Sequence, residues 1–529
     1  MISPTLSRAV RGRRPSALVD LARLLPKDGL GLYASGADLF SNAIFGRDSA
    51  MAADYLLRLR PDVARGVILK LAQLQGTRLA AAGPESNEEE PGKIHHEHRR
   101  LYVDGRRVRH RSARILQQLS AIWGGEKTSL TYYGSTDATP LFVRTAVRYC
   151  KHRGDAILGE PVVRRDGTRV TVRDSVLAAV DWITGKLDES PIGLVEFQRR
   201  NPSGIPFQVW KDSGTSYLHL DATIANWDAP IAALEVQAYA YDALIGAAHL
   251  FGDSQLAAGW RERAQALRGN IFKCFWMPGA GYFAMGLDRN ASGTPRWIES
   301  IASNAALLLD TSIFDGLPDA EEYIEAVARR VTGPEFLTEA GIRCRSLNEE
   351  ELVDFQDYHG TWTVWMKETF DATRGLYRQG LPALASQLAV RLLNAVNTAG
   401  AHVEFLYVSP DQRVMYDFRG RDPRSSQATE IVATNVPEQP LAWTLSAALA
   451  LKWLLGSKRD LYAPVDWSGP RSSRPQLDAR LLRDTPRLPL LSSVDEFASA
   501  YERRGDFVLN RALGHERDLA ARARHRTRA

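Results

Sequence analysis

Between about residue 50 and residue 455 the sequence predicts helices that come in pairs, with long polar loops between them. The second helix of the first pair repeats apolar residues at spacings of three and four, which marks one buried face: Val63, Val67, Leu71 and Leu74. The same pattern predicts six pairs, at 50–59 and 61–79, 113–123 and 137–152, 173–186 and 228–251, 254–274 and 301–310, 318–331 and 359–374, and 379–399 and 437–455. Each of these faces has to be buried against another helix.

Strand patterns are few and short, at 101–103, 162–163 and 170–172. They do not alternate with helices at βαβ spacing, which argues against a doubly wound sheet. The segments 228–251 and 442–453 are apolar enough to be central helices. Six helix pairs that close on themselves form a mainly α (α/α)6 barrel, with apolar inner helices and the long loops gathered at one rim. We expect this fold.

The barrel is expected to span residues 29–456. Residues 1–28 are rich in Arg and Pro and predict an N-terminal arm with room for one short helix. Residues 457–529 are rich in Pro, Arg and Ser, which predicts a C-terminal extension with one or two surface helices within 494–519. The Arg-rich residues 520–529 are typical of a solvated basic tail.

The composition is that of a globular protein without special partners. A net charge of +5 results from 67 basic and 62 acidic residues, which does not favour nucleic acid as a partner. Cys150, Cys274 and Cys344 lie far apart and form no CxxC pair, so we expect no disulfide framework, no zinc site and a reducing cytoplasm. No apolar run approaches the ~20 residues of a membrane helix, and no signal peptide is evident. The oligomeric state stays open.

The stretch Gln208–Ser213 places an acid beside an indole, a cation and a hydroxyl. Trp210 offers a flat apolar face for a sugar ring, and Asp212 can supply a proton if its surroundings raise its pKa. The competing interpretation is a helix start, with Asp212 or Ser213 as the N-cap and Trp210 as a packing residue.

Six further loops or helix starts combine an acid or amide with aromatic, histidine or arginine residues. They contain Arg47 and Asp48, Glu90 to Glu97, Tyr132 to Asp137, Glu235 to Gln237, Tyr358 to Trp362, and Val403 to Phe405. If the barrel closes, these side chains meet at one rim. A ring of hydrogen-bonding groups and aromatic plates suits a ligand with many hydroxyl groups.

Two groups need separate consideration. Glu235 and Gln237 lie in an apolar helix, so Glu235 is either paired with a cation or faces a polar cavity. His95, His96 and His98 are close in sequence, but their spacing is not that of an HExxH zinc site and no second cluster supplies further ligands. We expect neither a metal nor a cofactor.

Several motifs resemble, in the same order, those of glycogen-debranching-type amylo-α-1,6-glucosidases, which are six-hairpin (α/α)6 glycosidases related more distantly to glucoamylase-like and mannosylglycerate-hydrolase-like enzymes. The motifs are Phe45–Asp48, Glu90–Ile94, Tyr132–Gly134 with Asp137–Phe142, Trp210–Ser213 and Glu235–Tyr239. The resemblance covers about residues 30–455. The sequence departs from the family where His402–Leu406 replaces a Pro-Glu-Leu motif, and where Tyr358–Trp365 lacks the usual proline and following acidic residue.

The resemblance implies inverting hydrolysis of an α-glucosidic bond in an α-glucan branch or a related oligosaccharide. Asp212 is then the general acid and Glu404 the best match for the general base, with Glu430 and Glu438 as alternatives. Substrate-binding residues are expected among Arg47, Asp48, Glu97, Tyr133, Asp137, Trp210, Lys211, Glu235, Gln237, His359, Trp362 and Trp365. Arg47 and Asp48 would grip sugar hydroxyls, and Tyr133, Trp362 and Trp365 would form walls.

Lys211 would oppose protonation of Asp212 if it pointed inward, so we expect it to turn elsewhere or to bind a hydroxyl. Two other functions stay open. One is a hydrolase of a small α-glycoside such as glucosylglycerate or mannosylglycerate, and the other is a barrel that binds carbohydrate without cleaving it.

Overall fold

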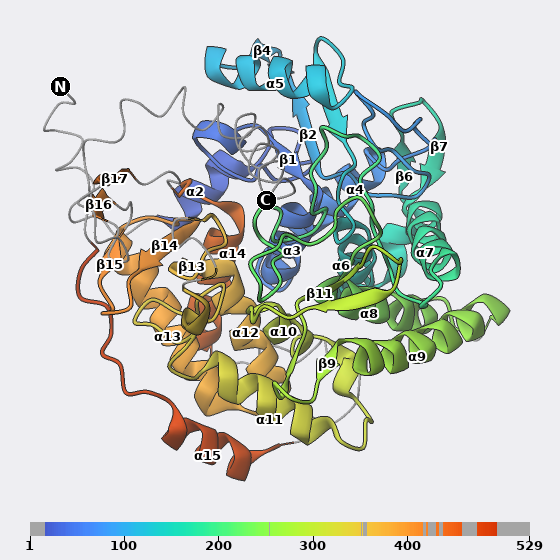
Figure 1. Ribbon diagram of the computed structural model, residues 1–529. Coiled ribbons are helices and arrows are strands. Elements are labelled where there is room, and N and C mark those ends of the chain that lie inside the picture. The colour runs from blue at the N-terminus through green and yellow to red at the C-terminus, as the bar shows by residue number, and fades with distance from the viewer. Residues whose placement is uncertain are drawn as a thin grey trace, which may run out of the picture.

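The computed structural model shows a closed ring of six inner helices (Figure 1). It describes residues 16–252, 254–350, 352, 357–415, 419–421, 430–432, 437–457 and 473–494. The inner helices are α3 (Gly46–Leu56), α6 (Ala138–Arg153), α8 (Leu234–Leu250), α10 (Asn304–Leu308), α12 (Met366–Arg378) and α14 (Ala442–Ser457). Each inner helix contacts the next one along the chain, and α14 returns to contact α3. The predicted (α/α)6 barrel is therefore confirmed.

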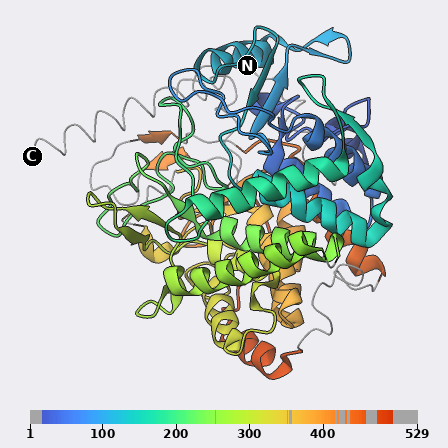
Figure 2. The ribbon, with the colours of Figure 1, turned by 90° about the vertical axis from the view of Figure 1, so that its right-hand side faces the viewer.

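Six outer helices surround this ring, and Figure 2 shows two of them, α7 and α9, on the outside of the molecule. They are α2 (Ala17–Leu24), α4 (Pro61–Gln73), α7 (Val172–Glu189), α9 (Gln255–Phe275), α11 (Ala320–Val331) and α13 (Pro382–Ala399). The pattern of apolar residues located all of these helices except α2, which the sequence placed in an N-terminal arm. Leu21 and Leu24 of α2 are buried in the main core, where this helix packs against α14.

After the first pair, α3 with α4, the predicted pairing is shifted by one helix, because each inner helix contacts the outer helix that follows it: α6 with α7, α8 with α9, α10 with α11, and α12 with α13. Helix α5 (His110–Ile122) does not pair with α6 but contacts β5 (Ser129–Tyr132) and a short 3-10 helix at Asp38–Phe40. Its apolar residues form a small separate core with Leu101 and Trp123. Helix α6 contacts α7, the next helix along the chain, and also α4. Local periodicity locates a helix but does not choose its partner, and this explains the difference.

Short antiparallel sheets lie at one rim, where the inner helices begin. Strand β1 (Ile44–Phe45) leads into α3, β8 (Ala232–Ala233) leads into α8, and β13 (Thr363–Trp365) leads into α12. The sheets have the orders β1-β2-β5, β12-β11-β8 and β13-β14-β15. Because each of these strands runs directly into an inner helix, the first turns of these helices are fixed at the same rim.

The remaining strands are short, and three of them confirm the expected strand segments: β3 (Tyr102–Val103), β6 (Pro161–Val163) and β7 (Arg169–Thr171). The others are β2 (Glu97–Arg100), β4 (Arg106–Arg107), β9 (Trp276–Met277), β10 (Tyr282–Phe283), β11 (Gly286–Arg289), β12 (Pro295–Ile298), β14 (Phe405–Val408), β15 (Val414–Met415), β16 (Arg419–Arg421) and β17 (Glu430–Val432).

A helix of the C-terminal extension, α15 (Pro475–Asp484), packs against α11 and α13. Leu477 and Leu481 are buried there, and the carboxylate of Asp478 accepts hydrogen bonds from the backbone N–H groups of Ala383 and Leu384, at 2.8 and 3.1 Å. These bonds satisfy free N–H groups in the first turn of α13. The helices expected within 494–519 and the basic tail lie outside the described residues, apart from residue 494.

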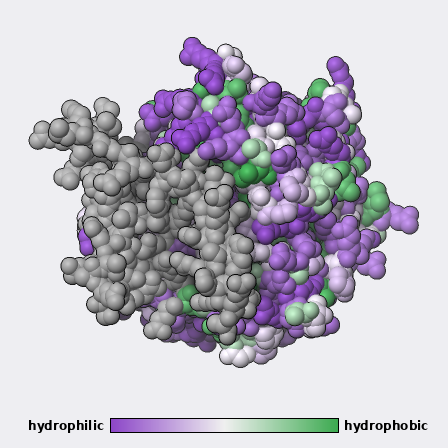
Figure 3. Space-filling model, turned by 45° about the horizontal axis from the view of Figure 1, so that its top comes forward, coloured by the Kyte–Doolittle hydropathy of each residue, from purple (hydrophilic) through white to green (hydrophobic). Residues whose placement is uncertain are grey.

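Among the described residues, none of the helices is long and apolar enough to cross a membrane. Figure 3 shows hydrophilic residues over most of the coloured part of the face that it presents, with small hydrophobic areas between them.

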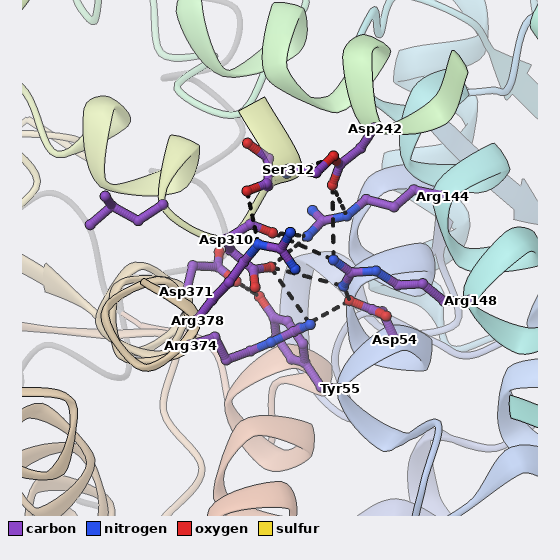
Figure 4. Close-up of polar contacts among 12 residues, drawn as sticks. Asp54, Tyr55, Arg144, Arg148, Asp242, Asp310, Ser312, Asp371, Arg374 and Arg378 are labelled. Carbon is purple, nitrogen blue, oxygen red and sulfur yellow. Dashed lines mark hydrogen bonds and ion pairs between the residues drawn. The ribbon is translucent and has the colours of Figure 1, made fainter. Parts of the chain in front are cut away.

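The interior of the ring, away from the sheets, holds a cluster of buried charges (Figure 4). Asp54 of α3 accepts from Arg148 of α6 at 2.5 Å and from Arg374 of α12 at 2.9 Å. Arg144 of α6 donates to Asp310 at 2.6 Å. These ion pairs join helices that are far apart in sequence, and because the charges are buried, each one depends on its partner.

Replacing Asp54 by Asn should therefore destabilise the fold strongly, because Arg148 and Arg374 lose a common buried anion. We expect a loss of roughly 3–5 kcal/mol in the free energy of unfolding, measured by urea denaturation. Asp188→Asn is the control, since Asp188 pairs with Arg263 at 2.9 Å with both side chains exposed. Its cost should stay below about 1 kcal/mol. Equal costs for the two variants would show that the buried cluster does not stabilise the ring.

Candidate functional site

Arg47, in the first turn of α3, contacts three carboxylates. Its guanidinium donates to Asp137 at 3.1 Å and to Asp212 at 3.3 Å, and its Nε lies 3.7 Å from Asp48. Asp137 immediately precedes α6 and also accepts from Ser135 Oγ at 2.7 Å. One guanidinium thus connects the starts of two inner helices with the loop that carries Asp212.

Asp212 is the most open member of this group. Its side chain is 25% exposed, whereas that of Arg47 is 6% exposed. Burial raises the pKa of Asp212 to about 6, against the opposing effect of Arg47, and the nearby Asp137 adds to the increase. A carboxyl group with this pKa is partly protonated near neutral pH and can donate a proton.

The two residues before Asp212 are anchored beneath it. Trp210 and Lys211 are almost fully buried. The indole Nε1 of Trp210 donates to Glu368 Oε1 at 2.8 Å, and the ammonium of Lys211 donates to the same oxygen and to Ser303 Oγ at 3.1 Å. The Lys211 ammonium therefore points to Glu368 and Ser303.

An aromatic cluster packs around Trp210. The rings of Trp365 and Trp443 meet Trp210 edge to face, with centroids 4.8 and 5.1 Å away. His359 stacks on Trp365 at 5.4 Å, and its Nδ1 lies 3.1 Å from Ser213 Oγ and 3.3 Å from Ser216 Oγ. Burial holds the pKa of His359 well below its ordinary value, so the ring is neutral. His359 thus contacts the part of the loop that follows Asp212 in the sequence, at Ser213 and Ser216.

Glu404 lies directly before β14, on a different segment of the same rim. The hydroxyl of Tyr358 donates to Glu404 Oε1, and the backbone N–H of Glu438 donates to Oε2 at 3.0 Å. Burial raises the pKa of Glu404 to about 8, and Glu438 and Asp48 add to the increase. The carboxylate of Glu438 accepts from the backbone N–H groups of Leu39, at 2.6 Å, and Phe40, at 3.3 Å.

Among the three candidate bases, these contacts favour Glu404. Glu404 binds Tyr358, whose ring packs against Trp365 beside Trp210, whereas the carboxylate of Glu438 binds the backbone of Leu39 and Phe40. The side chain of Glu430 lies outside the described residues. Asp48 and Tyr358 link Glu404 to Asp212. Asp48 raises the pKa of Glu404 and is itself raised to about 7, mainly by burial and with a contribution from Asp212. The pKa of Tyr358 is raised by burial, then by Glu404, and also by Asp212.

Several residues that the sequence suggested for substrate binding have protein partners instead. The amide of Gln237 bonds to the backbone N–H and C=O of Val195, both at 2.8 Å, and the hydroxyl of Tyr133 donates to the Leu74 carbonyl at 2.8 Å. The other pairs are Glu97 with Arg99, Glu235 with Asn304 at 2.9 Å, and Trp362 Nε1 with Glu350 at 2.6 Å. These contacts favour a supporting role for Glu97, Tyr133, Gln237 and Trp362 over direct contact with a substrate. Glu235 is only half engaged, because its buried Oε1 has no hydrogen-bond partner among the described residues.

Sequence reasoning missed Glu368 and the tyrosine hydroxyl of Tyr358. Glu368 lies three residues after Trp365, in the first turn of α12. Glu368 lies in a buried inner helix, which is the same signal that singled out Glu235. It was missed because the family resemblance indicated that no acidic residue follows the Tyr358–Trp365 motif as it does in that family. Tyr358 lies in the same motif as His359 and Trp362, but only those two residues were expected to bind substrate.

The histidines near residue 95 serve the local structure. His95 Nε2 lies 3.2 Å from the Ile44 carbonyl, and His98 Nδ1 lies 2.9 Å from Thr131 Oγ1. Burial lowers the pKa of His95 to about 3. In the part of the chain that the structure describes, no group of three or more His, Cys, Asp or Glu side chains is placed to hold a metal ion.

No family model and no curated protein sequence matches the chain. Its structure is similar to two crystal structures of the GH63 mannosylglycerate hydrolase from Thermus thermophilus. The complex with glucose has a TM-score of 0.50 and the complex with Tris one of 0.51; both are 16% identical in sequence, and each match covers 83% of this chain and 98% of that chain. At this identity the likeness concerns the fold. The chain therefore has the (α/α)6 fold found in that glycoside hydrolase.

Proposed function

We propose that the protein is an inverting glycoside hydrolase in which Asp212 is the general acid and Glu404 the general base. The observation that carries this proposal is that Tyr358 donates to Glu404 and packs against Trp365, which packs against Trp210, two residues before Asp212. Burial raises the pKa values of both carboxyl groups. An inverting mechanism uses one carboxyl to protonate the leaving oxygen and another to activate water, with roughly 6.5–9.5 Å between them.

The pKa values alone do not divide the roles, because their order places the resting proton on Glu404 rather than on Asp212. With pKa values of about 6 for Asp212 and about 8 for Glu404, the pair carries one proton between these pH values. Hydrolysis requires that proton on Asp212 and a charge on Glu404. The reactive form is therefore the minor singly protonated form with the proton on Asp212, and it is populated most between about pH 6 and pH 8.

The remaining groups suit a compact sugar. Arg47 and Asp48 are buried beside Asp212, and the buried Asp48 Oδ2 has no hydrogen-bond partner among the residues that the structure describes. A sugar hydroxyl is a suitable donor for this oxygen, because a buried acceptor without a partner is costly. Asp212 is the most exposed of the carboxyl groups around Arg47.

Because the charged groups around Asp212 are buried and Asp212 itself is only partly exposed, a small α-glycoside is favoured over a branched glucan as substrate. The mannosylglycerate hydrolase with a similar fold is named for such a substrate. The motif resemblance favours the second candidate, an α-1,6-glucosidic bond in a glucan. Release of sugar from glucosylglycerate, mannosylglycerate, isomaltose and limit dextrin separates the two. Binding of these sugars without cleavage of any would instead support the carbohydrate-binding barrel.

Asp212→Asn and Glu404→Gln should both abolish most of the activity, by roughly 10²–10⁴-fold in kcat, with the fold intact by circular dichroism. The leaving group separates the two roles. With the α-glycosyl fluoride of the same sugar, Asp212→Asn should recover much of its activity, because fluoride departs without strong acid assistance. Glu404→Gln should stay inactive, since water still requires a base. Equal losses of Asp212→Asn on both substrates would contradict the acid role.

The pH dependence of kcat/KM should be bell-shaped, with limbs near pH 6 and pH 8. Below about pH 6 both carboxyls are protonated and the base is lost; above about pH 8 both are ionised and the acid is lost. Glu404→Gln removes one titrating group, and any residual activity should lose the limb near pH 8. A profile that is flat from pH 5 to pH 9 would rule out this pair.

A further inference from the structure

Both residues that precede Asp212 bind to one buried carboxylate, that of Glu368. Oε1 of Glu368 accepts from Trp210 Nε1 at 2.8 Å and from the ammonium of Lys211, and Oε2 accepts from the thiol of Cys344 at 3.0 Å. Glu368 is 1% exposed and lies in the first turn of α12. The loop that carries Asp212 is therefore tied to an inner helix immediately beside the carboxyl group.

Two lysines keep this buried carboxylate charged. Burial raises the pKa of Glu368, but Lys211 and Lys367 outweigh this effect and hold its pKa below the ordinary value. Lys367 also lies 4.4 Å from the centroid of the Trp210 ring and pairs with Asp371 at 3.0 Å. The indole is thus held at its edge by Glu368 and on its face by Lys367.

We infer that Glu368 is a positioning residue for the proposed general acid. By binding Trp210 and Lys211 it fixes the backbone on one side of Asp212, while Ser213 is fixed on the other side by Asp357, at 2.9 Å, and by His359. By holding the Lys211 ammonium it also keeps a cation away from the carboxyl group that has to be protonated. This inference rests on the proposed hydrolase function and assigns a role to a residue outside the reacting pair.

Glu368→Gln tests both effects. The buried Lys211 ammonium loses its anion, and Asp212 is the next residue in the chain. A cation released toward Asp212 stabilises its ionised form, which should move the limb of the pH profile near pH 6 to lower pH. Misplacement of the acid should reduce kcat about 10–100-fold with little change in KM. The loss should be smaller on the α-glycosyl fluoride, which needs little acid assistance.

Two further variants separate positioning from a general loss of structure. In Glu368→Gln combined with Lys211→Met, the unpaired cation is absent, so the protein should regain stability and the limb should return to its wild-type pH. Its kcat should stay low on the glycerate glycoside, because Trp210 has lost its anionic anchor. Asp242→Asn is the matched control, since Asp242 is a buried carboxylate that pairs with Arg144 at 3.3 Å in the interior cluster. It should lower stability without moving the limb.

The substrates are the glycerate glycoside that is cleaved best and the α-glycosyl fluoride of its sugar. An unmoved limb and equal losses on both substrates in Glu368→Gln would overturn the positioning role. Wild-type kcat in the double variant would do so too, even if the single variant does not fold. If Asp212→Asn stays fully active on the glycoside, the proposed function fails instead. If Asp212→Asn is inactive and Glu368→Gln behaves like the wild type, only the role of Glu368 is lost.

Discussion

Closing six helices into a ring places charged side chains in an interior that cannot hydrate them, and the arrangement of those charges determines the rest of the structure. In α3, Arg47 and Asp48 lie in the first turn and Asp54 lies near the end. In α12, Glu368 lies in the first turn and Arg374 two turns further on. Glu368 is paired with Lys211, whereas at the start of α3 three carboxylates share the single cation of Arg47.

The difference between the interior cluster and the rim explains why chemistry is expected at only one of them. In the interior cluster Asp54 faces Arg148 and Arg374, and its pKa is lowered. At the rim, Asp48, Asp137 and Asp212 share the guanidinium of Arg47, and Glu404 has a hydroxyl and a backbone N–H as partners. Burial with too few cations raises the pKa values of Asp48, Asp212 and Glu404 toward neutrality. Groups of this kind can exchange protons near neutral pH.

Much of the fold could be predicted from the sequence, because helix periodicity and proline stops are local. The inner helices α6 and α8 were found within a few residues of their ends. The outer partner of α6, α7, was not, since the choice between α5 and α7 depends on burial across the whole ring. Helix α2 was missed as part of the barrel for the same reason, as its buried residues Leu21 and Leu24 meet a helix more than 400 residues later.

The candidate site was predictable where residues with complementary chemistry are neighbours in the sequence, as Trp210 and Asp212 are. It was not predictable where a side chain satisfies the backbone of a distant loop. Nothing in the sequence shows that the amide of Gln237 pairs with Val195, or that Glu368 reaches Trp210 across 158 positions. Such contacts follow from closure of the ring, so they become visible only in three dimensions.

Inversion requires two carboxyl groups on opposite sides of one glycosidic bond, with water between them. The anomer that the wild-type protein releases first reports on this arrangement. When cleavage of an α-glycoside is followed by proton NMR within the first turnovers, the β-anomer of the released sugar should form first. Initial release of the α-anomer would show retention of configuration and would contradict the roles given to Asp212 and Glu404.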